Sequence, residues 1–225
     1  ATGADYNVII DGECSKWNFV TTNTSASKII EVLGWGTYSF ETCNFNNCGS
    51  FIGGPVCRDV INLSPNASLS FSFCGQLTTI QNIEFWDISN LTSTISMFQS
   101  CLLFTGDLSN WDMSNITNAF FMFTTAKAFN SDVSSWDTSS ITNCAYMFAN
   151  AESFNSDINF DLTSATNNAY GIFYGCSLFN GDVSGMDTST LTLMNNMFDD
   201  CISLNNNSMM GWDVSNVENM TNMFS

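Results

Sequence analysis

The chain has 225 residues, a formal net charge of −17 and 44% hydrophobic residues, so it can bury a sizeable core and is not an acidic disordered tail. Its four basic residues cannot neutralise a phosphate backbone, which excludes nucleic acid as a partner and disfavours anionic lipid. No window approaches the roughly 18 consecutive apolar residues of a membrane helix, so we expect no membrane insertion.

Residues 1–70 are predicted to form an N-terminal β-rich cap or assembly segment. The ranges 6–10, 17–21 and 37–40 are β-branched or alternate apolar and polar residues, and this pattern is typical of strands. The range 28–33 is ambiguous between helix and strand. Five glycines between 34 and 54, followed by Pro55, indicate turns. A cap is expected here because a repeat array needs its open ends covered.

From about residue 71 the chain repeats itself every 25 residues or so, which predicts a repeat architecture. The repeat is marked by Met97-Phe98, Met122-Phe123, Met147-Phe148, Ile172-Phe173, Met197-Phe198 and Met223-Phe224. A second marker is an apolar residue followed by Asp, as in Trp86-Asp87 and Trp111-Asp112. We expect each unit to be one coil, because stacked coils share a core that a single coil cannot bury alone.

The unit 107–129 illustrates the expected coil. Leu108 and Trp111 are spaced for a short extended stretch that turns. The apolar residues that follow have helical spacing, and they are Ile116, Ala119, Met122, Phe123 and Ala126. The sequence therefore predicts one short strand-like segment and one short helix in each coil. The tryptophan and phenylalanine columns are interpreted as core residues rather than as a platform for sugars.

The unit Phe129-Asn-Ser-Asp-Val-Ser-Ser-Trp-Asp-Thr-Ser-Ser-Ile-Thr-Asn-Cys-Ala-Tyr-Met-Phe148 resembles the BspA-like leucine-rich repeats of the mycoplasma-lipoprotein type, a domain of unknown function. The resemblance covers 71–225. It implies an α/β fold: a leucine-rich-repeat-like solenoid of about six 25-residue coils, here following the disulfide-bearing cap. It implies a secreted or surface protein, but no particular activity.

Nine cysteines are many for a reduced cytosolic protein of this size, and the chain has no His and no zinc-binding spacing. Together with Ala1 in place of Met, which fits removal of a signal peptide as well as a trimmed chain, they predict an extracellular or cell-surface location. Equivalent positions of neighbouring coils predict the disulfides Cys74–Cys101 and Cys176–Cys201, with buried thiols as the alternative.

The remaining cysteines receive separate expectations. Two further bridges, of undetermined connectivity, are expected in the cap among Cys14, Cys43, Cys48 and Cys57. Cys144 shares a column with Ala119 and Ala169 and is expected to be a free buried thiol.

The repeated Asp-x-Ser/Thr triplets after the Trp position are interpreted as turn chemistry, because Asp and Ser side chains bond nearby backbone N–H groups. A calcium ladder along the Asp columns is the alternative, but Ca²⁺ takes 6–8 oxygen ligands and no calcium-loop motif is present. No metal and no cofactor is predicted.

Covalent glycans are possible partners if the chain is a secreted eukaryotic protein. The candidate acceptors are Asn90 and Asn115, which occupy the same turn of successive coils, and Asn23, Asn66, Asn206 and Asn219. The number of such triplets is no larger than chance gives for this composition.

Catalysis has no support in the sequence, because there is no His, no phosphate loop and no nucleophile beside a base. The main expectation is an extracellular structural or adhesive protein, and one form it could take is a subunit of a head-to-tail filament or surface coat. Its assembly candidates are Trp212, Met223 and Phe224, whose apolar side chains lie in the last coil and would contact another copy or further chain. The alternative is a secreted module that recognises carbohydrate or a partner protein, and a contiguous exposed aromatic patch would favour it.

Overall fold

The computed structural model describes residues 16–18, 39–48, 62–165 and 168–225. Three parallel strands, β1 (Lys16–Asn18), β2 (Ser39–Asn44) and β3 (Asn62–Ser70), form one sheet in the order β1-β2-β3. The strands expected at 17–21 and 37–40 overlap β1 and β2. The ranges 6–10 and 28–33 lie outside the described residues. β3 was not predicted, and Pro65 within it hides the strand pattern.

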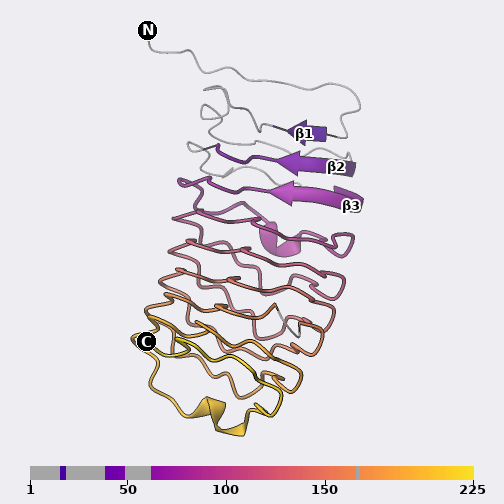
Figure 1. Cartoon of the computed structure of the whole chain (residues 1–225). Helices are drawn as coiled ribbons and strands as arrows, with labels where there is room; N and C mark the ends of the chain where they lie inside the picture. The colour runs from indigo at the N-terminus through magenta and orange to yellow at the C-terminus, as the bar shows by residue number, and fades with distance from the viewer. Residues whose placement is uncertain (1–15, 19–38, 49–61, 166–167) are drawn as a thin grey trace.

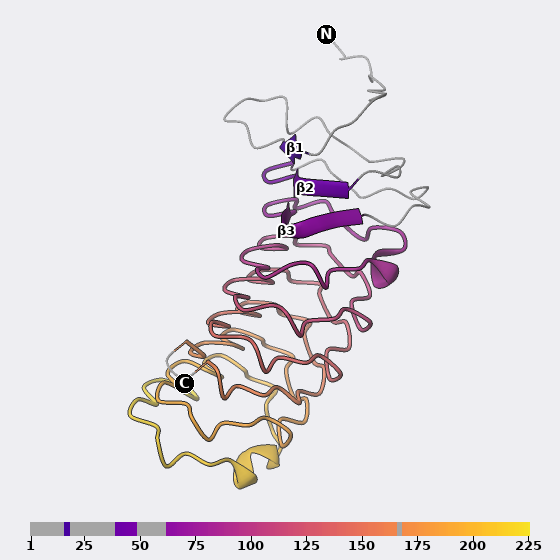
Figure 2. The same cartoon turned by 90° about the vertical axis from the view of Figure 1, so that its right-hand side faces the viewer.

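After β3 the chain winds into a stack of similar coils that continues to the C-terminus (Figures 1 and 2). Backbone hydrogen bonds join each coil to the next one, as from Ser96 N–H to Phe120 O at 2.9 Å and from Phe98 N–H to Met122 O at 2.8 Å. Isolated parallel bridges link Ser93 to Asn118 and Asn118 to Asn143. The stacking places residues about 25 positions apart side by side, and columns of equivalent residues run along the molecule.

The sequence predicts a short helix in each coil, and this prediction is wrong. Among the described residues the helices are two 3₁₀ turns, η2 (Ile83–Phe85) and η3 (Ser208–Gly211). The segment with helical spacing is a run of β-turns, closed for example by Met122 N–H to Ala119 O and by Ala126 N–H to Phe123 O. These turns bring the same i and i+3 positions together as a helix would, so the apolar pattern does not distinguish the two.

Left-handed residues recur at fixed places in these turns. The third residue of each of the two turns around the Met-Phe pair has a positive φ, as at Phe121 (58°) and Thr125 (62°). The equivalent residues in the next coils are Tyr146 and Asn150, and then Gly171 and Gly175. Gly and Asn tolerate this conformation, whereas it is costly for aromatic and β-branched residues.

Two columns of stacked phenylalanines fill the core. The first contains the Phe of each Met-Phe pair, and neighbouring ring centroids such as Phe123 and Phe148 are 5.4 Å apart and nearly parallel. The column begins at Phe45, before the residue-70 boundary that the repeat predicts, and Phe45 stacks on Phe71 at 5.4 Å. The second column contains Phe104, Phe129, Phe154 and Phe179. All these rings from Phe45 to Phe198 are buried, as expected.

The indole column adds hydrogen bonds to this packing. Trp111, Trp136 and Trp212 each donate from Nε1 to a backbone carbonyl of the preceding coil, at 2.8, 3.0 and 2.9 Å. Phe160 and Met186 occupy the same column without such a donor. The core is thus aromatic along most of its length, and each of these three indoles adds a polar tether between coils.

Candidate functional site

The acidic columns serve the backbone turns, as the turn interpretation predicts. In Asp137-Thr-Ser139, the Oδ1 of Asp137 accepts the Ser139 hydroxyl at 2.6 Å and the Ser139 N–H at 3.1 Å. These two bonds, the hydroxyl first, lower the pKa of Asp137 from its ordinary value of 3.8. The same arrangement lowers the pKa of Asp87, Asp187 and Asp213.

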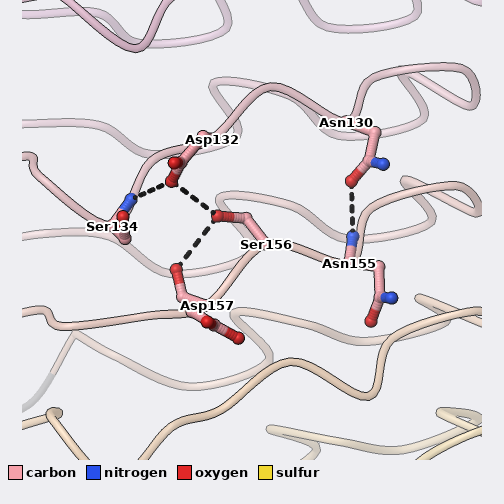
Figure 3. Close-up of a pocket in the computed structure, with 6 residues that line it drawn as sticks. All are labelled: Asn130, Asp132, Ser134, Asn155, Ser156 and Asp157. Carbon is pink, nitrogen blue, oxygen red and sulfur yellow. Dashed lines mark hydrogen bonds between the residues drawn. The ribbon is translucent and has the colours of Figure 1, made fainter.

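A second polar surface runs beside the Phe129 column. Figure 3 shows Ser156 between two coils: its hydroxyl oxygen lies 3.3 Å from Asp132 Oδ1 and 3.0 Å from the Asp157 carbonyl oxygen, and its single hydrogen can be donated to either acceptor. Asn130 Oδ1 accepts the Asn155 N–H at 2.8 Å. These groups line a shallow hollow of about 280 Å³, but their polar atoms bond to one another across the coils. Within the described residues, no group of three metal-ligating side chains is placed to hold an ion.

The predicted disulfides are not formed in the structure. Of the cysteines that it describes, Cys48, Cys74, Cys101, Cys144, Cys176 and Cys201 are all free and buried. The thiols predicted to pair instead donate to a backbone carbonyl of the preceding coil, as from Cys101 to Phe71 O and from Cys201 to Phe173 O, both at 3.0 Å. Cys144 is free, as expected.

The cap cysteines are only partly described. Cys14 and Cys57 lie outside the described residues, and Cys43 lies in β2. Cys48 stands three residues after Phe45, as Cys74 stands after Phe71 and Cys101 after Phe98, so it shares their column. Burial raises the pKa of Cys101 and of Cys144 to about 12.

Of the candidate glycosylation residues, Asn90, Asn115 and Asn219 are exposed and Asn206 is half-buried. Asn115 Nδ2 donates to Ser89 O at 3.0 Å, and Asn206 Nδ2 donates to Asn180 O at 3.0 Å. Asn66 lies in β3, and Asn23 lies outside the described residues. Attachment of a sugar uses one Nδ2 hydrogen, so Asn115 could keep its bond with the other hydrogen. Asn206 also donates to Gly181 O at 3.0 Å and would lose one of its two bonds to backbone carbonyls.

The three assembly candidates differ in exposure. Met223 is buried at 7% exposure and faces the core, so it is not available to another copy. Trp212 is half-buried against Phe198, with ring centroids 6.0 Å apart. Phe224 is 60% exposed, and one face of its ring stacks on Phe198 at 5.8 Å. Further exposed apolar side chains of the last coil are Ile202, Met210, Val214 and Met220.

A group of half-buried aromatic rings on the outside of the middle coils was not predicted from the sequence. This aromatic strip consists of Phe120, Phe121, Tyr146, Tyr170 and Tyr174. Ring centroids of Phe120 and Phe121 are 3.8 Å apart, and Phe121 stacks on Tyr146 at 5.7 Å. Tyr146 meets Tyr170 edge-to-face at 5.3 Å and Tyr174 at 6.3 Å.

A glycine makes room for one ring of the strip, and two asparagine side chains lie close to the strip in the sequence. A Cβ atom at Gly171 would overlap the Tyr146 ring, so Gly171 leaves the space in which the ring lies. Asn118 lies two residues before Phe120 and Asn143 three residues before Tyr146, and each Oδ1 accepts a backbone N–H two residues on, at 3.1 and 3.2 Å. Their Nδ2 groups are left to donate to other acceptors. The missed signal was an aromatic residue directly before Met-Phe in two consecutive units.

In the described part of the chain, no helix has the length and hydropathy to cross a membrane. No curated protein and no solved structure matches the chain. One family model matches residues 67–175 and again residues 159–225, which together include every Met-Phe unit. Its two matches cover well over half of the sequence. The chain therefore belongs to the family described as "Mycoplasma protein of unknown function, DUF285".

Proposed function

We propose that this chain is an adhesive protein of the cell surface or extracellular medium. Its coils form a leucine-rich-repeat-like solenoid of the BspA-like type, which displays a recognition surface rather than a catalytic centre. The observation that carries the proposal is the aromatic strip, because half-buried rings clustered on one surface of a strongly acidic protein are typical of a recognition site. The polar columns elsewhere are occupied by bonds between coils and offer no comparable surface.

Adhesion can be tested with beads that carry the purified protein. We expect the beads to attach to intact cells or to extracellular-matrix preparations. Replacing Phe121 and Tyr146 with Gly and Asn should abolish attachment, whereas Phe85→Ala should not. Phe85 is a suitable control because it is 65% exposed and lies in η2, outside the strip. Failure of the unmodified protein to attach to any surface would contradict an adhesive function.

A structural role is the second candidate, and the apolar side chains exposed on the last coil favour it. A second copy of the chain could cover Phe224 and Met220 if its N-terminal segment packed against them head to tail, and such a contact does not close and yields a filament. Phe224→Ser should then lower the sedimentation-derived mass at high concentration. A protein that stays monomeric at high concentration would count against the filament.

A further inference from the structure

We infer that the aromatic strip binds a neutral saccharide, with sugar rings lying along successive coils. This inference deepens the proposed adhesive function and rests on it. The strip crosses three consecutive coils through the stacked rings of Phe121 and Tyr146, with Tyr170 and Tyr174 beyond them. A surface that repeats with the coils suits a ligand that is itself built of repeating units.

Backbone conformation suggests that the rings are kept for something other than stability. Phe121 and Tyr146 have φ of 58° and 52°, in the left-handed region that is unfavourable for bulky side chains. Equivalent positions in the following coils hold Gly171 and Asn196, which are suited to this conformation. Two consecutive coils thus accept a strained backbone to place an aromatic ring outside the core, and such strain is typically retained where it serves a function.

Charge around the strip selects an uncharged ligand. The four neighbouring coil segments 93–99, 118–124, 143–149 and 168–174 contain no charged residue, although the whole chain carries a net charge of −17. An anionic glycan would be repelled by the protein as a whole, and a cationic ligand would find no carboxylate within these segments. A neutral ligand meets neither of these electrostatic penalties.

The chemistry of the side chains fits hydroxylated rings. The face of an aromatic ring carries partial negative charge and attracts the C–H groups on the face of a pyranose, while the rim of hydroxyls needs hydrogen-bond partners. The strip supplies both, because the tyrosines carry hydroxyls and Asn118 and Asn143, in the same coil segments as the rings, have Nδ2 groups that can donate. The exposed surface area of five half-buried rings is much smaller than the about 800 Å² that each partner of a stable protein complex buries. The strip therefore suits a saccharide better than a protein partner.

The test uses the intact chain and an array of neutral oligosaccharides that includes glucans, galactans, mannans and N-acetylglucosamine oligomers. We expect binding to at least one neutral class. Tyr146→Asn and Phe121→Gly, which introduce residues suited to the left-handed backbone, should each weaken binding about tenfold or more without lowering the melting temperature. Phe85→Ala, a matched loss of an exposed ring outside the strip, should bind like the unmodified protein.

The outcomes separate the ligand class from the broader function. If no neutral saccharide binds, or if both strip variants bind as well as the unmodified protein, the saccharide assignment is overturned. If beads still attach to cells through the strip while the array stays blank, the ligand is a protein and the adhesive function survives. If the two variants unfold at a clearly lower temperature, the rings stabilise the fold and the strain argument fails.

Discussion

Single residues with a left-handed backbone offer the most direct check on how the coils are built. Thr125 has a φ of 62°, and its equivalents in the next three coils are Asn150, Gly175 and Asp200. Thr125→Asn should stabilise the protein by about 1 kcal/mol, because Asn tolerates this conformation better than a β-branched residue. Denaturant unfolding would measure the change. Thr105→Asn, at a residue without a positive φ, should give no gain.

The thiols give a second test at the residue scale. Burial raises the pKa of Cys101, Cys144 and Cys201 to about 12, so the reactive thiolate is scarce at neutral pH. The native protein should therefore leave these residues unmodified by an alkylating reagent, and unfolding should expose them. This protection would allow free thiols to persist outside the cell. Recovery of a linked Cys176–Cys201 peptide from fresh protein would instead support the sequence-based disulfide.

The Asp-x-Ser turns make stability depend on pH. Hydrogen bonds from Ser139 lower the pKa of Asp137 in the folded state, and those from Ser89 and Ser189 do the same for Asp87 and Asp187. A lowered folded pKa contributes stability above the ordinary value of 3.8, and that stability is lost as pH falls through the folded pKa.

Thermal unfolding at a series of pH values tests this dependence. The unmodified protein should melt at lower temperature as pH falls below 3.8. The triple variant Asp87→Asn, Asp137→Asn, Asp187→Asn should show a weaker dependence, because the amide oxygen still accepts both hydrogen bonds but does not titrate in this range. Identical pH profiles for the two proteins would show that these turns do not govern acid sensitivity.

At the level of the coil, the Trp residues should stabilise the fold by hydrogen bonds between coils as well as by burial of their rings. Trp136 is 3% exposed and donates to Leu108 O at 3.0 Å. Trp136→Phe should cost about 0.5–1.5 kcal/mol, because Leu108 O loses the indole donor but still accepts the Trp111 N–H at 3.1 Å. Trp136→Ala should cost about 3–5 kcal/mol. Phe85→Ala at the surface should change the unfolding free energy by less than about 0.5 kcal/mol. Equal costs for the Phe and Ala variants would show that the indole hydrogen bond, rather than the packing of the ring, accounts for the stabilisation.

The coil also shows what the sequence could and could not predict. The repeat period identified the buried Met-Phe, Trp and second Phe columns, because each position recurs with the same apolar character. It failed to distinguish a helix from a run of β-turns, since both bring residues i and i+3 together. Asn150, Gly175 and Asn196 were the available signal, because Asn and Gly recur where the turns require a positive φ. The aromatic strip was missed because its five residues occupy three different repeat positions and so form no single column.

On the scale of the whole molecule, the net charge works against the stacking of the coils. A net charge of −17 favours solubility but repels one part of the stack from another. Only one ion pair is formed among the described residues, between Lys127 and Glu152 at 2.6 Å, and both side chains are 49% exposed. Cohesion therefore depends on the aromatic columns and on the hydrogen bonds between neighbouring coils, which makes it a nearest-neighbour property.

Nearest-neighbour cohesion predicts a gradient of local stability along the stack. Phe148 N–H donates to Ile172 O at 2.9 Å inside the stack, whereas the described residues provide no acceptor for the Phe224 N–H. Hydrogen exchange in dilute protein should thus be slow at Phe148 and fast at Phe224. Slow exchange at Phe224 in a dilute monomer would contradict the gradient. Protection of Phe224 that rises with protein concentration would mean that a second copy covers the end of the stack, whereas Phe148 should exchange at the same rate at every concentration.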